Sequence, residues 1–308
     1  MPPEGPIQLM KSALLQQIID GMPHDFADPH DDHRVTREKM APLHGHPLLP
    51  DTSVTLAEIG AVGTGLLTRP TSDADRGLIV FFHGGAFVSC GLQSYLFFAE
   101  FIAEQVGVPV LTIDYRLAPE HLFPAALDDC LSVVAGLAEL GPIQDRLVFL
   151  GDSCGGGLAL STAMQRRDAG QRLPRGVVSL SGWVDLDTRG YPAGGSVSRD
   201  PFITEGFLRA RARDYLGPKG DLRDPRASPA RGSLGGLPPL LLQVGETDAC
   251  RADAEHLTGS ALAAGVDAQL DVVAGGVHGV QGLVNLGVPE AVAAWESVRR
   301  FTGAVLAG

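Results

Sequence analysis

A serine flanked by glycines gives the clearest chemical signal in this sequence. The apolar run 147–150 leads into residues 151–155, which read Gly-Asp-Ser-Cys-Gly, and a helix-like stretch follows. A Gly-x-Ser-x-Gly turn between a strand and a helix is typical of a nucleophile elbow, which exposes the serine hydroxyl. The glycines let the turn close sharply, and the N-terminus of the following helix favours negative charge. The pattern therefore predicts that Ser153 is a nucleophile.

A carboxylate and a histidine follow Ser153 in the chain, each directly after an expected strand. Residues 239–245 lead to Glu246 and Asp248, and residues 268–274 lead to His278. A histidine can take the serine proton and return it to the leaving group, while a carboxylate fixes the imidazole tautomer. We expect Asp248 to be the acid and His278 the base. Glu246 is the alternative acid, and its other role would be an exposed charge at the strand end.

A pair of glycines after a third apolar run could stabilise the charge that such a serine creates. Residues 78–82 are followed by His83, Gly84, Gly85 and Ala86. Glycines directly after a strand let backbone N–H groups approach a ligand closely. Beside a nucleophile elbow, such a loop forms an oxyanion hole together with the residue after the nucleophile, here Cys154. We therefore expect the oxyanion hole at Gly84, Gly85, Ala86 and Cys154, with His83 bracing the loop.

Two further stretches make the chain similar to a known family. Residues 114–129, which read DYRLAPEHLFPAALDD, and residues 224–229, which read DPRASP, resemble signatures of the bacterial hormone-sensitive-lipase family of α/β-hydrolases. The resemblance covers roughly residues 50 to 305. It implies hydrolysis of carboxylic esters with short or medium acyl chains, without a cofactor. By family position, Gly85, Ala86 and Cys154 would donate their N–H groups and Gly84 would shape the turn.

Two residues depart from the family pattern. Ala86 stands where the family often has a third glycine, and Cys154 stands where it often has alanine. Both residues would act through their backbone N–H groups, which the side chain does not remove. We therefore expect the oxyanion hole to be retained, with the Ala86 methyl group trimming its space. The Cys154 thiol is expected to pack inside the helix rather than to act as a nucleophile.

The elements that must position these residues alternate along the chain. Strands are expected near residues 54–59, 63–69, 77–83, 109–114, 146–151, 177–181, 239–245 and 268–274. Helices are expected near residues 94–106, 124–139, 154–168, 251–264 and 289–304. The first two strands form a hairpin, and the rest a mostly parallel sheet covered on both faces. The predicted fold is α/β, an α/β-hydrolase fold with an eight-stranded mostly parallel sheet flanked by helices.

A helical cap is expected over the carboxyl ends of the strands, where ligands bind in such sheets. Its N-terminal part is residues 1–50, which begin with an amphipathic pattern of Ile7, Met10, Leu14, Leu15, Ile18 and Ile19. Its second part is the insertion 183–236, between strands six and seven, with a helix from Phe202 to Tyr215. The catalytic core then comprises residues 51–182 and 237–308. Candidate pocket walls are Phe87, Val88, Tyr95, Phe202, Phe207 and Val280.

The amino-acid composition limits which partners and which cellular location are expected. The net charge of −12, with no basic run, excludes nucleic acid as an expected partner. No apolar run is long enough for a membrane span. The four cysteines lack metal-ligand spacing, and the start of the chain lacks a basic secretion signal, so reduced thiols and a cytoplasmic location are expected. Five histidines among aspartates, His24, His30, His33, His44 and His46, are taken as a solvated cap segment rather than a metal site.

The expected function is that of a serine hydrolase that cleaves carboxylic esters through an acyl-enzyme. The same triad would serve a lactone, amide or N-acetyl hydrolase, and the motifs do not separate these substrates. A non-catalytic small-molecule receptor is a third reading, which the presence of His278 disfavours. No cofactor and no metal are expected. A small-molecule ester is the expected partner, and a homodimer is kept open.

Overall fold

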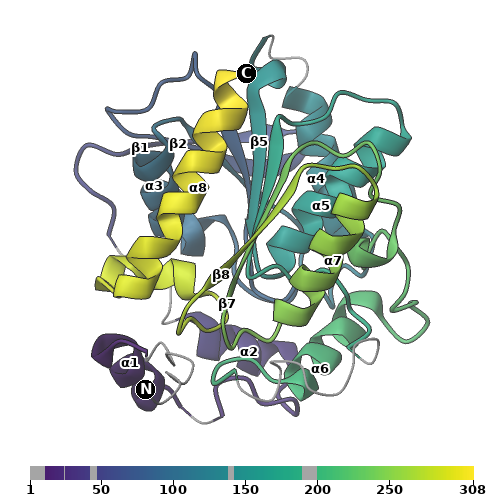
Figure 1. Cartoon of the computed structure of the whole chain (residues 1–308). Helices are drawn as coiled ribbons and strands as arrows, with labels where there is room; N and C mark the ends of the chain where they lie inside the picture. The colour runs from purple at the N-terminus through teal and green to yellow at the C-terminus, as the bar shows by residue number, and fades with distance from the viewer. Residues whose placement is uncertain (1–10, 24, 42–46, 138–141, 189–199) are drawn as a thin grey trace, which may run out of the picture.

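One twisted sheet forms the centre of the protein. A computed structural model describes residues 11–23, 25–41, 47–137, 142–188 and 200–308 (Figure 1). The strands are β1 Ser53–Ile59, β2 Val62–Thr68, β3 Leu78–Phe82, β4 Val110–Asp114, β5 Leu147–Asp152, β6 Gly176–Leu180, β7 Leu240–Gly245 and β8 Ala268–Val273. They lie in the order β1-β2-β4-β3-β5-β6-β7-β8. All eight strands therefore form where apolar runs predicted them.

Parallel pairing dominates the sheet. β1 and β2 form the predicted antiparallel hairpin, and β2 also pairs antiparallel with β4. From β4 to β8 every neighbouring pair is parallel. The central strands β3, β6 and β7 are buried along their whole length, as expected for continuous apolar runs covered on both faces. The predicted eight-stranded, mostly parallel α/β fold is confirmed.

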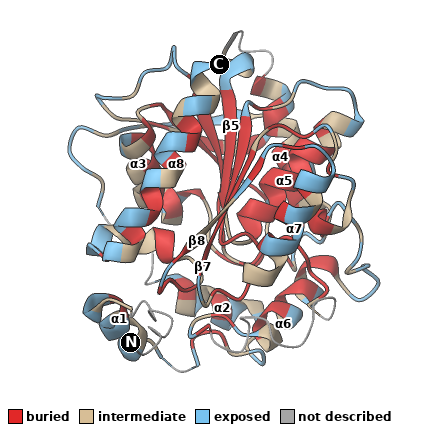
Figure 2. Ribbon diagram, viewed as in Figure 1, coloured by how far each residue is buried: buried red, intermediate tan, exposed pale blue. Residues whose placement is uncertain are grey.

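Helices cover both faces of the sheet. α3 Leu92–Val106 and α8 Pro289–Ala307 lie on one face, and α4 Ala125–Leu137, α5 Cys154–Asp168 and α7 Arg251–Ala263 lie on the other (Figure 1). Successive side chains of β3 point to opposite faces, so Phe81 packs against Phe98 while Phe82 packs against Phe149. Buried residues accordingly concentrate in the sheet and on the inward sides of these helices (Figure 2).

Three more helices lie together at one end of the sheet (Figure 1). They are α1 Ala13–Gly21, α2 His33–Met40 and α6 Glu205–Leu216. α2 was not predicted, although Asp32 is a strong signal for its start, because its side chain accepts hydrogen bonds from the N–H groups of Arg34 and Val35. α6 begins after Phe202, since Thr204 caps it by accepting from Phe207 N. The predicted positions Ile7, Met10, His24, His44 and His46 lie outside the described residues.

Two arginines connect α2 to the core and α6 to the segment of α2. Arg37 of α2 donates from Nε to Val88 O at 2.6 Å, and its guanidinium forms two hydrogen bonds with the Glu120 carboxylate at 2.8 and 2.7 Å. Arg211 of α6 donates to Asp31 O at 2.6 Å and to the Thr36 hydroxyl. Segments from both ends of the predicted cap are therefore tied to one another, and α2 is anchored to the sheet's loops.

Short 3-10 helices complete the framework. They are η3 Pro142–Arg146, η5 Pro229–Arg231 and η6 Val280–Leu286. η6 was not predicted, and it follows His278 directly, so it places apolar side chains beside that residue. The Ala118–Pro119 and Phe123–Pro124 bonds, which lie in the stretch 114–129, are cis. Among the helices that the structure describes, none has the length and apolar character needed to cross a bilayer.

Candidate active site

Ser153 lies on a sharp turn between β5 and α5. Its backbone has φ 51° and ψ −124°, a conformation that non-glycine residues adopt only when their surroundings impose it. The surroundings here are very close, since a Cβ added to Gly155 would lie 2.0 Å from Phe82 O. A Cβ added to Gly151 would lie 2.2 Å from Gly155 O. The two glycines therefore let the elbow press against β3, and this contact holds Ser153 in its strained conformation.

The structure brings together the three residues that the sequence assigned to the triad. His278 Nε2 lies 3.0 Å from Ser153 Oγ, and His278 Nδ1 lies 2.9 Å from Asp248 Oδ1. Asp248 is fully buried, and its Oδ1 also accepts a hydrogen bond from Cys250 N at 2.8 Å. Glu246, the alternative acid, is exposed and accepts from Gly275 N at 2.8 Å. Asp248, rather than Glu246, is thus the carboxylate that contacts the imidazole.

Carboxylates around His278 favour its protonated form. Burial would lower the pKa of His278, but the carboxylates of Asp248, Asp200 and Asp152 together outweigh this effect, and the pKa is raised to about 9. Burial works against the charge of Asp248 too, yet His278 holds the pKa of that carboxyl below its usual range. Asp248 is therefore an anion beside the ring, which suits it to stabilise an imidazolium.

The loop after β3 adopts an unusual backbone next to Ser153. Gly85, Ala86 and Phe87 all have positive φ, with values of 109°, 54° and 66°. Gly85 and Ala86 line the same cavity as Ser153. Cys154 is the first residue of α5, so its N–H has no acceptor within the helix. Of the four residues predicted for the oxyanion hole, Gly85 and Ala86 thus line the cavity at the serine and Cys154 directly follows it.

Gly84, the fourth predicted residue, belongs to the same loop but does not line the cavity. A Cβ at Gly84 would lie 2.4 Å from Asp152 Oδ2 and 2.7 Å from the Tyr95 hydroxyl, so only glycine fits there. The Tyr95 hydroxyl in turn donates to Asp152 Oδ2 at 2.8 Å, and burial raises the pKa of Asp152 to about 6. His83 stacks on Tyr115 with ring centroids 4.0 Å apart. Residues around Gly84 therefore brace the loop.

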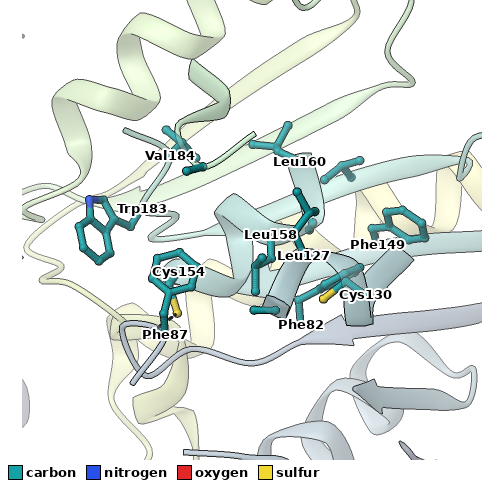
Figure 3. Close-up of a cluster of buried hydrophobic side chains, with 14 of the residues drawn as sticks. Phe82, Phe87, Leu127, Cys130, Phe149, Cys154, Leu158, Leu160, Trp183 and Val184 are labelled. Carbon is teal, nitrogen blue, oxygen red and sulfur yellow. Dashed lines mark hydrogen bonds between the residues drawn. The ribbon is translucent and has the colours of Figure 1, made fainter. Parts of the chain in front are cut away.

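The Cys154 side chain holds the loop from inside. Phe87 N donates to Cys154 Sγ at 3.2 Å (Figure 3). The Tyr115 hydroxyl lies 3.8 Å from the same sulfur. Burial raises the pKa of the Cys154 thiol to about 12. A buried, protonated thiol is a poor nucleophile, because the thiolate is the reactive form. The thiol therefore links the loop to the elbow, and its place in the core agrees with the expected packing role.

A cavity of about 450 Å³ opens at Ser153 and His278. Of the predicted pocket walls, Tyr95, Phe202 and Phe207 line it. Phe87, Val88 and Val280 do not, and this part of the prediction needs correction. Phe87 turns into the core and stacks on Tyr215 with ring centroids 3.7 Å apart (Figure 3 shows Phe87 beside Trp183). Val88 and Val280 are fully buried among other apolar side chains.

Most of the cavity wall was not predicted residue by residue. The N-terminal segment contributes four apolar side chains, α3 two phenylalanines, and η6 and its neighbours a polar and apolar mixture. These additional residues are Ile18, Met22, Phe26, Met40, Cys90, Phe97, Phe98, Asp152, Ile203, Leu208, Gly279, Gln281, Gly282, Leu283, Asn285 and Leu286. Of these residues, Ile18 belongs to the amphipathic pattern seen in the sequence. Which of these side chains faces the cavity depends on how the segment docks.

One cluster with metal-ligand atoms occurs among the described residues, and it is part of this site. Donor atoms of Asp248, Cys250 and His278 lie within 4.8 Å of one another. A thiol must lose its proton to bind a metal, and burial raises the pKa of Cys250 well above its usual range. The Asp248 and His278 atoms already bond to each other. The cluster is therefore better suited to hold a proton than a metal ion.

Comparisons with known proteins agree with this geometry. A family model described as an alpha/beta hydrolase fold matches residues 79–282. The chain is 38% identical over 197 residues to an acetyl-hydrolase of Streptomyces hygroscopicus, and the match spans 64% of this chain and 65% of that protein. It is 30% identical over 224 residues to an esterase of Acinetobacter venetianus, and here the match spans 73% of this chain and 74% of the relative.

A solved structure is similar to this chain in its fold. It is described as an esterase from the bacterial hormone-sensitive lipase family, and it matches 96% of this chain and 99% of its own with a TM-score of 0.89 at 32% identity. The resemblance inferred from the motifs is confirmed by these matches. The chain therefore belongs to the alpha/beta-hydrolase family and, within it, to the bacterial hormone-sensitive-lipase group of ester hydrolases.

Proposed function

We propose that Ser153, His278 and Asp248 carry out the ester hydrolysis of this protein through an acyl-enzyme. The Ser153 hydroxyl attacks the acyl carbonyl while His278 Nε2 takes its proton. His278 then gives this proton to the leaving alcohol, and a water molecule attacks the acyl-enzyme by the reverse route. The chain of hydrogen bonds from Asp248 through His278 to Ser153, at the mouth of an apolar cavity, is the observation that carries the proposal.

The oxyanion of the tetrahedral intermediate is proposed to bind the N–H groups of Gly85, Ala86 and Cys154. The positive φ values of Gly85 and Ala86 and the place of Cys154 at the start of α5 support this assignment. Donors held in place before the reaction lower the barrier without reorganisation, and one donor is worth roughly 3 kcal/mol. Gly84 would shape the turn rather than donate.

The substrate is proposed to be an ester of a short or medium acyl chain. A cavity of about 450 Å³ with mostly apolar walls is of the size that small ligands occupy. The name of the Streptomyces relative, acetyl-hydrolase, favours an acetyl group as the acyl part and leaves room for N-acetyl substrates as a second candidate.

We also propose that residues 1–50 and 183–236 act as the cap over residues 51–182 and 237–308. A cytoplasmic location and a homodimer stay predictions.

Removal of the nucleophile tests the proposal. With p-nitrophenyl acetate, butyrate, octanoate and laurate, we expect turnover that peaks at the shorter chains and falls by about 10⁴-fold or more in Ser153→Ala. Ser132→Ala is the matched control, since Ser132 lies on α4, donates its hydroxyl to Gly60 O and does not line the cavity. Full activity in Ser153→Ala would refute the assignment. Turnover of N-acetyl substrates but not of esters would favour the second candidate.

A further inference from the structure

Asp200 is a buried carboxylate with an unusual set of partners. Only 7% of its surface is exposed, and it lies just before the segment that leads into α6. Its Oδ1 accepts hydrogen bonds from Phe202 N at 2.8 Å and Ile203 N at 3.0 Å. Its Oδ2 accepts from Ala249 N at 3.0 Å and His278 N at 2.9 Å. Four backbone donors therefore converge on one side chain.

The four donors belong to two different parts of the site. His278 is the proposed base and Ala249 directly follows the proposed acid, so Oδ2 bridges the two loops that carry them. Phe202 and Ile203 both line the substrate cavity, so Oδ1 holds a piece of its wall. Each oxygen thus serves one of the two parts. The carboxylate links the cavity wall to the proton-transfer residues across 78 positions of sequence.

The bonding pattern favours the ionised form of Asp200. Every one of the four bonds is accepted by the carboxylate, and none is left to an O–H donor. Burial raises the pKa of Asp200, whereas the charge of His278 and the N–H donors of Phe202 and Ile203 favour the anion. The groups that face His278 are then the carboxylates of Asp248, Asp200 and Asp152 and the neutral thiol of Cys250.

A second side chain holds the next amide of the same loop. Gly279 N donates to Ser181 Oγ at 3.0 Å, and the Ser181 hydroxyl donates to Gln281 Oε1 at 3.2 Å. Ser181 follows β6, so the sheet anchors Gly279 while the cap side anchors His278 through Asp200. Ser181 is neutral and Asp200 is charged. Of the two anchors, only Asp200 can therefore change the proton affinity of the imidazole by its charge.

We propose that Asp200 is a positioning residue for the hydrolysis, which aligns the loops of His278 and Asp248 with the cavity wall and stabilises the imidazolium by its charge. This inference rests on the proposed function, because it assigns His278 as the base. In the reaction His278 gains a proton from Ser153, and a second nearby anion favours that transfer. The same bonds connect Phe202 and Ile203 to the base, so substrate contacts there are coupled to its position.

Asp200→Asn separates charge from shape. The asparagine side chain has the same size as that of aspartate but no charge. Its NH₂ group would face the two backbone N–H groups that one carboxylate oxygen accepts in the wild type. We expect kcat/KM to fall by about tenfold or more. We also expect the acid limb of its pH profile to move about one unit lower, because loss of the anion lowers the pKa of His278. Asp200→Glu keeps the charge but shifts it, so its rate should fall by a similar factor while the limb stays at the wild-type pH.

Asp187→Asn is the matched control. Asp187 is also buried and accepts from Arg223 Nε at 2.9 Å, but it is not among the carboxylates that raise the pKa of His278. We expect it to change the melting temperature and not the pH limb. An unshifted limb in folded Asp200→Asn, or a rate within twofold of wild type in Asp200→Glu, would overturn the inference.

A readout without turnover keeps the two proposals distinguishable. The pKa of His278 can be followed by NMR, with its resonances assigned against His278→Gln. A lower pKa in Asp200→Asn is expected even if none of the tested esters is hydrolysed. Wild-type protein that fails to turn over esters would count against the proposed function alone, whereas an unchanged His278 pKa in the variant would count against the role of Asp200. If Asp200→Asn does not fold, the Asp200→Glu rate decides.

Discussion

At the scale of single residues, His278 is defined by its charged surroundings. The ring bonds to Asp248 and Ser153, and carboxylates raise its pKa to about 9 against the effect of burial. A raised histidine pKa means that protonation stabilises the folded state. This contribution is fully present below the unfolded pKa of roughly 6.5 and is lost as the pH rises through about 9. Proton transfer from Ser153 requires the opposite, neutral state of the ring.

The pH profile of hydrolysis should show that the neutral form of His278 is needed for the reaction. Since only neutral His278 can accept the Ser153 proton, we expect kcat/KM to rise about tenfold per pH unit up to a pH near 9 and then to level off. Asp248→Asn should lower the plateau by about 10⁴-fold and move the limb to lower pH. Initial rates with p-nitrophenyl butyrate, corrected for spontaneous hydrolysis, provide the profile. A limb near pH 6.5 in wild type would contradict the charged environment.

At the scale of elements, α2 connects the cap side to the core. Arg37 connects it to Val88 and Glu120, and Met40 at its end lines the cavity. Arg37 also holds the pKa of the Glu120 carboxyl down at about 2. A lowered carboxyl pKa stabilises the fold above roughly pH 4.5, and this contribution is lost as the pH falls toward 2. Both groups are partly exposed, so salt should weaken the pair.

Arg37→Met should loosen α2 without touching the proposed catalytic residues. We expect KM to rise by about three- to tenfold, because the cavity wall carried by α2 is less well held, while kcat stays within about twofold. Steady-state kinetics with two chain lengths measures both constants. Arg34→Met on the same helix is the control, since Arg34 is exposed. An equal KM change in both variants would show that Arg37 has no special anchoring role.

At the scale of the whole molecule, the sheet and its two helical layers hold the turn of Ser153 in place. β5 runs through the centre, and Phe149 on it packs edge-to-face on Phe82 with ring centroids 5.3 Å apart (Figure 3). The next element, α5, begins immediately after Ser153 and buries Leu158 in the same cluster. The elbow is therefore strained locally and supported by the core.

Phe149→Ala tests this support. A large cavity in the centre of the core should lower the free energy of unfolding by about 3–5 kcal/mol. Leu56→Ala on the exposed side of β1 is the control and should change it by less than about 0.5 kcal/mol. Urea unfolding followed by circular dichroism measures both. A change below about 1 kcal/mol in Phe149→Ala would mean that the elbow does not depend on this packing.

Local chemistry allowed much of this protein to be predicted from its sequence. Apolar runs bounded by turns placed all eight strands, because a parallel sheet buried on both faces requires continuous apolar residues. Ser153 was identifiable because its turn tolerates only glycine at the flanking positions. Asp248 and His278 follow strand ends that meet at one edge of the sheet, so their proximity followed from the fold class. These features depend on residues close together in the chain.

Only the tertiary structure decided which side chains surround that serine. Phe87 and Val280 are as apolar as Phe202, yet they pack into the core while Phe202 faces the cavity. Asp200 carries no motif, and its importance appears only when the amides of Ala249 and His278 join the two local amides on its carboxylate. The physical reason is the same in both cases. Burial and long-range hydrogen bonds depend on how loops dock, and periodicity along the chain contains no record of that docking.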